Sequence, residues 1–258
     1  MRRIDFSLVV VLLVLALFGG GIYQFARTYP DANRGLLIFA KAQKDLFVDA
    51  GLIQESYQVR APDSLTRMLR LQTVIVAAQS EPHTLYVGAG VILGERAGIV
   101  KILTARHIVA HGGQRFVVFR QGVAFKVLRV LPDRRQDLAL VYVRAAPGIA
   151  YTVARIGAAG FATGQPFVVM GHPGARSWIA SPGIAERHLL HTLLFCPTCD
   201  RGDSGAGAYD KSGVLRGIVV ARDVIAAPNV RTGRYFKVIA FEIVRPEAIR
   251  SFLRTANV

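Results

Sequence analysis

Hydrophobic and polar positions divide the chain into three parts, and the first is the most uniform. From Ile4 to Tyr23 the residues are almost all apolar, and Asp5 carries the only charge. A helix needs about twenty such residues to cross a bilayer. Residues 1–23 are therefore predicted to form a membrane anchor. A cleaved secretory signal is the alternative, but Phe18 stands where a cleavage site needs a small residue.

The second part, residues 24–65, mixes apolar and charged residues at roughly helical spacing. Asp31 or Asn33 can cap the start of this pattern, which predicts an amphipathic helix. The helix is either a stalk between the anchor and the body or a helix packed on the body, and the pattern does not separate these two arrangements.

The third part, residues 66–255, consists of short apolar runs broken by glycine, proline and charged turns. The runs fall into two groups of about six, on either side of the stretch "APGIAYTVARIGAAGFATG". Many short strands at this spacing predict an all-β protein with two six-stranded barrels, at about 66–145 and about 163–245. Pro246 then fits the first turn of a closing helix over 246–255.

Composition agrees with a folded body, because 52% of the 258 residues are hydrophobic and 19% are charged. The formal net charge of +15 favours contact with anionic lipid, nucleic acid or acidic polypeptide. A basic protein that mainly docks on such partners is one hypothesis. We expect no nucleic acid as partner, since neither a zinc-finger spacing nor a phosphate-binding glycine loop occurs. Membrane contact is expected through the N-terminal helix.

Three short stretches carry candidate chemistry within the β-rich part. They are "ILTARHIV" with His107 after a strand, "QDLALVYV" with Asp137 before a strand, and "CDRGDSGAG" with Ser204 in a glycine-flanked turn. A serine hydroxyl needs a histidine to take its proton, and the histidine needs a carboxylate to orient it. The three residues fit these roles together. Asp133 competes with Asp137 but lies in "PDRRQ", which reads as an exposed turn.

In this order the motifs resemble those of the trypsin/chymotrypsin-type serine proteases. The family pattern "TAxH" is matched at Thr104–His107, "D-[IL]-A-L" at Asp137–Leu140 and "GDSGG" at Gly202–Ala206, with alanine as the last residue. The stretches "GAGVIL" and "GVLRGIVVA" add to the likeness. "GHPG" followed by "SPGI" is similar to bacterial envelope proteases of the high-temperature-requirement type. The resemblance covers about residues 66–255.

The resemblance implies two antiparallel barrels with the active site in the cleft between them. It implies a serine endopeptidase that hydrolyses peptide bonds through an acyl-enzyme, with His107 as general base, Asp137 as its orienter and Ser204 as nucleophile. The backbone amides of Gly202 and Ser204 would form the oxyanion hole. The implied partner is a polypeptide substrate, and no cofactor or metal is expected. The rival hypothesis is an inactive protease-like scaffold that is anchored to the membrane and binds without cutting.

Two departures from the family pattern affect the serine turn. Ala206 replaces a glycine, which the turn tolerates only if the φ angle there is negative. In the digestive enzymes that the chain resembles, the acid at the position of Asp203 pairs with a newly cut N-terminus. No "IVGG"-like segment is present here to form one, so we predict no proteolytic activation. Asp203 must then find another partner or remain solvated.

The substrate pocket is predicted by likeness. Its base falls near Thr198, and its wall is formed by Val220, Ala221 and Arg222. Because Thr198 places no acid at the base, a deep slot for lysine or arginine is disfavoured. Arg222 would narrow the pocket or add positive charge.

The only cysteines are Cys196 and Cys199, in "FCPTC". They are expected to form a disulfide or remain free thiols. A zinc site with His188 and His191 is the alternative. It is disfavoured because two residues three apart on one strand point to opposite faces. A disulfide suits an extracytoplasmic location, which the N-terminal position of the anchor also favours for the body.

Overall fold

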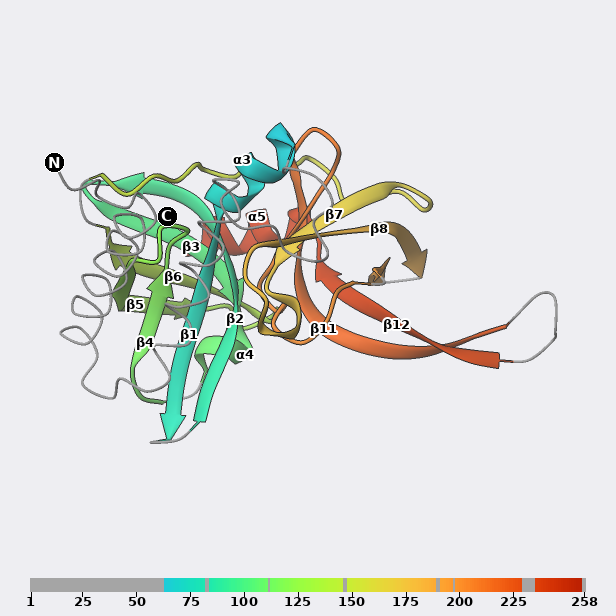
Figure 1. The fold of residues 1–258 in the computed structure, drawn as a ribbon, viewed down its shortest axis with the longest axis horizontal. Coiled ribbons are helices and arrows are strands. Elements are labelled where there is room, and N and C mark those ends of the chain that lie inside the picture. Colours follow the sequence, from blue (N-terminus) through green and yellow to red (C-terminus); the bar gives the residue numbers. More distant parts are fainter. Residues whose placement is uncertain are drawn as a thin grey trace, which may run out of the picture.

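Two closed barrels of six strands each lie side by side and make up the body of the protein (Figure 1). The computed structural model describes residues 63–81, 84–110, 112–145, 148–188, 191–196, 198–228 and 235–256. The predicted anchor and nearly all of the predicted stalk lie outside these ranges. Within them, no helix combines the length and the apolar character that a membrane span requires. The two antiparallel barrels predicted from the sequence are confirmed.

Barrel one closes in the strand order β1-β2-β3-β6-β5-β4, with every pair antiparallel. Its strands are rich in valine, isoleucine and leucine, and their inward-facing side chains fill one core. The short helix α4 follows β3 and precedes β4. The strands are β1 Thr73–Glu81, β2 Thr84–Arg96, β3 Ile99–Ala105, β4 Arg115–Val118, β5 Ala124–Pro132 and β6 Leu138–Arg144, and α4 is Arg106–Val109.

Barrel two repeats this arrangement in the order β10-β11-β12-β9-β8-β7. Its strands β11 and β12 extend well past the other strands as a two-stranded ribbon (Figure 1). A single 3-10 turn, η1, joins β7 to β8. The elements are β7 Pro166–Gly171, η1 Pro173–Ala175, β8 Ile179–His188, β9 His191–Phe195, β10 Gly207–Tyr209, β11 Leu215–Pro228 and β12 Tyr235–Val244.

Strand β8 continues through Pro182 and Gly183 to His188. Gly183 fits inside the strand for a steric reason. A Cβ there would overlap with the ring of Phe167 and the carbonyl oxygen of Phe195, so the glycine allows close packing inside the strand. Glycine in a strand can mark such an approach as well as a turn.

Two helices complete the body. The helix α3, Ser64–Gln72, was not predicted, since it spans the boundary between the stalk pattern and the first strand. Its N-cap Asp63 accepts a 2.6 Å hydrogen bond from the Thr66 amide.

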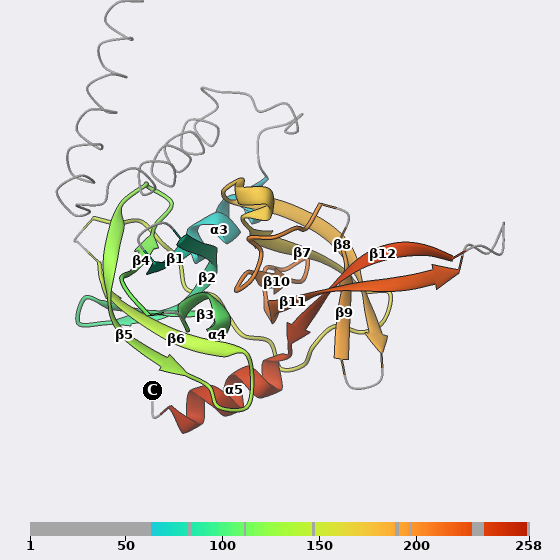
Figure 2. The ribbon, with the colours of Figure 1, turned by 90° about the horizontal axis from the view of Figure 1, so that it is seen from below.

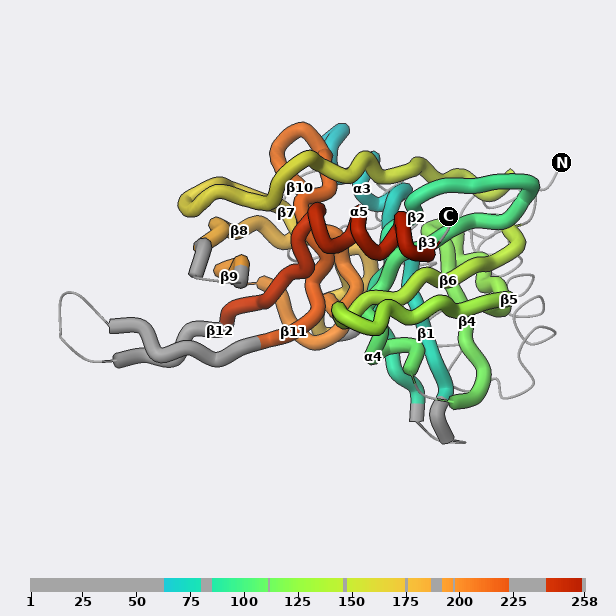
Figure 3. The backbone as a smooth tube through the Cα atoms, turned by 180° about the vertical axis from the view of Figure 1, so that it is seen from behind, coloured from blue at the N-terminus to red at the C-terminus, as the bar shows by residue number. Residues whose placement is uncertain are grey.

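The helix α5, Pro246–Thr255, confirms the predicted closing helix and begins with the proline at its first turn. It lies across the junction of the two barrels (Figures 2 and 3). Its buried residues Ile249 and Phe252 join the core cluster that contains the interior of barrel one and several residues of barrel two, and a buried phenylalanine contributes roughly 2 to 3 kcal/mol. Arg250 donates hydrogen bonds to the carbonyl oxygens of Gly157 and Ala158 in the link between the barrels.

Candidate active site

His107 lies on α4, one residue after the helix begins at the end of β3. Its backbone amide donates a 2.9 Å hydrogen bond to Asp137 Oδ1, and its ring Nδ1 donates a 2.5 Å hydrogen bond to Asp137 Oδ2. The amide of Arg106 also donates to the Asp137 carbonyl oxygen, at 3.2 Å. A carboxylate only accepts hydrogen bonds, so the ring proton lies on Nδ1. The other ring nitrogen, Nε2, is therefore left as the base.

Asp137 is held in its charged form by these contacts. Burial acts to raise the pKa of its carboxyl, since the side chain is only 28% exposed. The hydrogen bonds from His107 and the positive charge of Arg106, whose Nε lies 3.9 Å from Oδ1, act more strongly in the opposite direction. The net result is a pKa below the ordinary value for aspartate, so the carboxylate is ionised at neutral pH.

Ser204 lies in a tight turn between two glycines with positive φ, Gly202 at 102° and Gly205 at 83°. Residues with a side chain rarely adopt such angles, which explains both glycines. Hydrogen bonds from Gly205 N to Val219 O and from Ala206 N to Asp203 O, at 2.7 and 2.9 Å, fix the turn against β11.

Ala206 is not among the residues with positive φ, so this position meets the condition under which the turn tolerates alanine. The side chain of Ala206 is fully buried.

The serine turn packs directly on barrel one, beside the segment that carries His107. The Ser204 carbonyl oxygen accepts a 2.7 Å hydrogen bond from Ala89 N. A Cβ on Gly205 would overlap with Ala89 O and lie 2.5 Å from Thr104 Oγ1, three residues before His107. The structure therefore brings the middle of β2, the end of β3, α4 and the serine turn to one place between the barrels.

Gly88 shows the same close approach from the barrel-one side. A Cβ there would lie 2.6 Å from Ser204 O and 2.9 Å from the side chain of Ile108, the residue that follows His107. This glycine opens the "GAGVIL" motif, which explains its place in the resemblance.

Three polar groups around Ser204 are not engaged with the described part of the chain. The Ser204 hydroxyl forms no hydrogen bond with His107, and the amides of Gly202 and Ser204 donate none to another described residue. Such catalytic hydrogen bonds are often long or absent before substrate binds. Two amides in one turn, next to a serine hydroxyl, are suited to bind the oxygen of a substrate carbonyl.

Asp203, next to the serine, is completely buried. Its Oδ2 accepts a 3.0 Å hydrogen bond from Asp200 N, whereas Oδ1 has no hydrogen-bond partner in the described chain. Burial raises the pKa of this carboxyl to about 7, and the nearby charge of Asp200 adds to the rise, while the amides of Asp200 and His172 oppose it. Of the two predicted outcomes, Asp203 thus finds a backbone partner and is not solvated.

Sequence reasoning missed His172 and Trp178, which hold the loop over Asp203. Trp178 N donates to His172 Nδ1 at 3.0 Å, so the other ring nitrogen, Nε2, donates to Val74 O at 3.2 Å. Trp178 Nε1 donates to Thr73 O at 2.8 Å. These bonds connect the β7–β8 loop to β1 of the other barrel. The signals were the "GHPG" motif and the only tryptophan of the chain.

Two of the four predicted pocket residues line the same groove as Asp137. Val220 is buried and Ala221 is exposed, and both line a groove of about 510 Å³ to which Asp137 also contributes.

The other two predicted pocket residues are not in the lining of this groove. Thr198 is exposed, and Arg222 donates a hydrogen bond to Asp200 Oδ1 at 3.3 Å. This ion pair joins β11 to the loop that leads to Ser204.

Cys196 and Cys199 form a disulfide. His188 and His191 are direct partners across the β8–β9 hairpin, so the assumption that both lie on one strand was wrong. The bond between the sulfur atoms removes both thiolates that the alternative zinc site needs. Among the described residues, no group of three or more histidine, cysteine or acidic side chains is placed to hold a metal ion.

A family model, described as the trypsin-like peptidase domain, matches residues 88–218, about half of the chain. The chain belongs to the trypsin-like peptidase family. This match confirms the resemblance that the motifs indicated, and the protein is a serine peptidase. The comparison with curated proteins finds no match.

Solved structures similar to the peptidase include two forms of Rv3671c from M. tuberculosis. The active form of this protease has 16% identity and a TM-score of 0.59 over 78% of this chain and 93% of the other. The inactive form of a serine-to-alanine mutant has 17% identity and a TM-score of 0.56 over 78% and 97%. At such low identity the likeness shows a shared fold.

Proposed function

We propose that the peptidase is an endopeptidase whose catalytic triad is His107, Asp137 and Ser204. The observation that carries this proposal is the paired hydrogen bonding of His107 to Asp137, together with the packing of the Ser204 turn against the strand end before His107. A carboxylate, an imidazole with its proton on Nδ1 and a serine in a tight turn are the three groups that acyl transfer requires.

In the proposed mechanism His107 Nε2 removes the proton from the Ser204 hydroxyl as its oxygen attacks the substrate carbonyl. The imidazolium that forms is stabilised by the charged Asp137. The amides of Gly202 and Ser204 bind the negative oxygen of the tetrahedral intermediate, and each such donor contributes roughly 3 to 4 kcal/mol. His107 then gives the proton to the leaving amine, which leaves an acyl-enzyme, and water activated by the same ring hydrolyses it.

The first experiment is labelling with a fluorophosphonate probe, which reacts with an activated serine. We expect the wild-type chain to be labelled and Ser204→Ala to remain unlabelled, with equal melting temperatures for both. A folded wild-type protein that resists the probe would support the inactive scaffold. Label that persists in Ser204→Ala would place the nucleophile elsewhere.

We propose further that residues 4–23 anchor the peptidase in a membrane and that its body lies on the extracytoplasmic side. The apolar run and the disulfide between Cys196 and Cys199 support this location. The test is digestion of intact and permeabilised cells with an external protease. Digestion of the body in intact cells is the expected result, and digestion only after permeabilisation contradicts it.

A further inference from the structure

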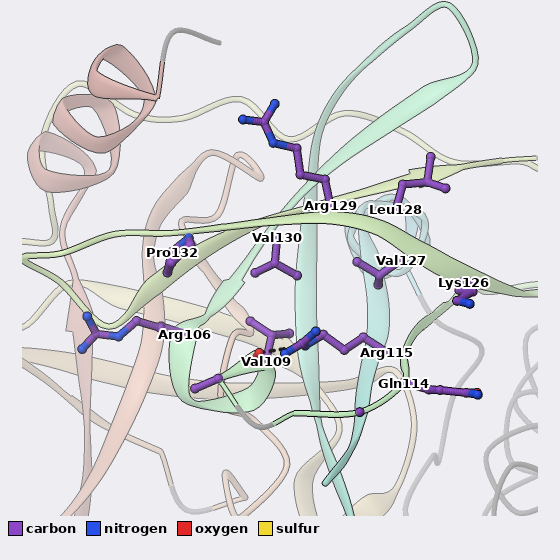
Figure 4. Close-up of a pocket in the computed structure, with 12 residues that line it drawn as sticks. Arg106, Val109, Gln114, Arg115, Lys126, Val127, Leu128, Arg129, Val130 and Pro132 are labelled. Carbon is purple, nitrogen blue, oxygen red and sulfur yellow. Dashed lines mark hydrogen bonds between the residues drawn. The ribbon is translucent and has the colours of Figure 1, made fainter.

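A second groove lies on barrel one, between α4 and β5, and has a volume of about 760 Å³. Its middle is apolar, and Figure 4 shows Val109 and Val130 facing each other across it. One end is formed by Arg106, the residue before the proposed catalytic base. The other end is marked by Lys126. The groove therefore starts beside the active site and leads away from it.

The charge of this groove is of one sign. Four of the twelve residues that line it are cationic, and none is acidic: Arg106, Arg115, Lys126 and Arg129. Lys126 and Arg129 are exposed and form no ion pair with a described residue. Arg106 donates to the Asp133 carbonyl oxygen and lies 3.9 Å from Asp137 Oδ1, and Arg115 donates to the Val109 carbonyl oxygen. An anionic partner is thus favoured mainly by the exposed charges of Lys126 and Arg129.

The wall of the groove is a strand edge with pairing on one side only. Strand β5 pairs with β4 over Ala124–Lys126, but from Val127 to Pro132 its only strand partner is β6. An extended peptide can add to such an edge through backbone hydrogen bonds. Lipid headgroups and free phosphate lack this alternation of amide and carbonyl groups.

A β-bulge shapes this edge. The register with β6 shifts between Val127 and Arg129, so Leu128 is the extra residue. Bulges re-aim side chains, and here both Leu128, which is 58% exposed, and Arg129 point outward. Figure 4 shows Arg129 on the opposite side of the strand from Val109, so positive charge flanks the edge on both sides.

We propose that this groove binds an acidic, extended segment of the polypeptide substrate, which pairs with the free edge of β5 while the scissile bond lies at Ser204. The inference rests on the proposed function and adds a substrate class to it: proteins with an acidic stretch near the cleaved bond. Valine side chains in the groove contact the apolar residues of this segment, and the cations contact its carboxylates.

Binding is measured without catalysis, on full-length Ser204→Ala. The probe is a fluorescein-labelled heptapeptide of alternating glutamate and valine, followed by fluorescence anisotropy. We expect Lys126→Glu to weaken binding about tenfold, as reversal of a contacting charge does, and binding to weaken with added salt. The matched control is Lys211→Glu, an exposed cation on the turn after β10, which should change binding less than about twofold.

Four outcomes decide the proposal. Equal losses of peptide binding for Lys126→Glu and Lys211→Glu would show an effect of net charge alone and would overturn the proposal. Equal binding of a peptide with glutamine for glutamate would also overturn it. Undiminished binding of a peptide with alternate amides N-methylated would exclude pairing with the strand edge. Vesicles of phosphatidylglycerol that bind in a Lys126-dependent way, while the peptide does not, would assign the groove to lipid.

Catalysis gives an independent readout. With Ser204 intact, Lys126→Glu should raise the KM of a cleavable peptide with a glutamate-rich extension about tenfold and leave kcat unchanged. The same peptide without the extension, and the rate of fluorophosphonate labelling, should not change. If labelling fails in every variant, the proposed function is wrong. If labelling is normal and Lys126→Glu has the same KM as the wild type for the extended peptide, only the proposal for the groove is wrong.

Discussion

Two carboxylates flank the candidate active site, and they are held by opposite means. Asp137 in barrel one is partly exposed, accepts hydrogen bonds from the amide and the ring of His107, and has a lowered pKa. Asp203 in barrel two is completely buried, accepts a backbone hydrogen bond from Asp200 N, and has a pKa raised to about 7. One is stabilised in its charged form and the other in its neutral form.

The difference shows that the two halves of the site depend on different physics. In the proposed mechanism, the half in barrel one needs a permanent negative charge to orient an imidazole and stabilise its cation. In the same mechanism, the half in barrel two needs a fixed backbone shape, because the amides of Gly202 and Ser204 must both point at the substrate oxygen. Glycines without room for a Cβ and a buried acid at the centre of the turn provide that shape. Substitutions on the two sides should therefore fail in different ways.

The largest effect is expected for Asp137→Asn. An asparagine is similar in size but favours the wrong imidazole tautomer, so kcat should fall by about 10⁴. Steady-state hydrolysis of a peptide measures this loss, and the circular dichroism spectrum should be unchanged. Activity within tenfold of the wild type would show that another group, such as Asp133, orients the base.

Gly205→Ala should break the shape of the other half. The new Cβ meets the Ala89 carbonyl in a backbone with positive φ, so we expect a loss of stability of about 3 kcal/mol or more. Urea unfolding measures the loss, and fluorophosphonate labelling should disappear with it. Gly112→Ala is the matched control, since no atom lies within 4 Å of a Cβ there. Equal stabilities for the two variants would contradict the close packing.

Asp203→Asn tests the buried acid through pH. Between the unfolded pKa near 4 and the native value of about 7, the native protein binds the extra proton, so wild-type stability falls as the pH rises through this window. The variant lacks this pH-dependent contribution to stability, because asparagine does not titrate. Its stability relative to the wild type should increase by up to about 4 kcal/mol from pH 4 to 7.5. Unfolding free energies at several pH values measure the difference.

The change of stability with pH has the opposite sign for Asp137, because its native pKa is lowered. Its contribution to stability is present above the unfolded pKa and is lost as the pH falls through the native value. Asp137→Asn should therefore lose stability at neutral pH and recover relative to the wild type in acid. Parallel curves for the two variants would remove the contrast between the carboxylates.

The sequence predicted the barrels and the site motifs because short stretches of neighbouring residues determine both. Short apolar runs mark strands, and His107, Asp137 and Ser204 each lie in a motif of a few residues. The environment of Asp203 could not be predicted in this way. It depends on Trp178 and His172, which contact β1 about a hundred residues earlier in the chain. The role of Gly183 could not be predicted in this way either, because its packing partners Phe167 and Phe195 lie on other strands.

The smallest effect is expected at the ion pair of Arg222 and Asp200. Both side chains are partly exposed, at 36% and 49%, so Arg222→Ala should change stability by less than about 1 kcal/mol. Selectivity is the sharper readout, since removal of this charge near the serine turn should reduce cleavage after acidic residues relative to neutral ones. Arg254→Ala, an exposed cation on α5, controls for net charge. If both variants shift selectivity equally, the effect comes from net charge, and Arg222 does not contact substrate.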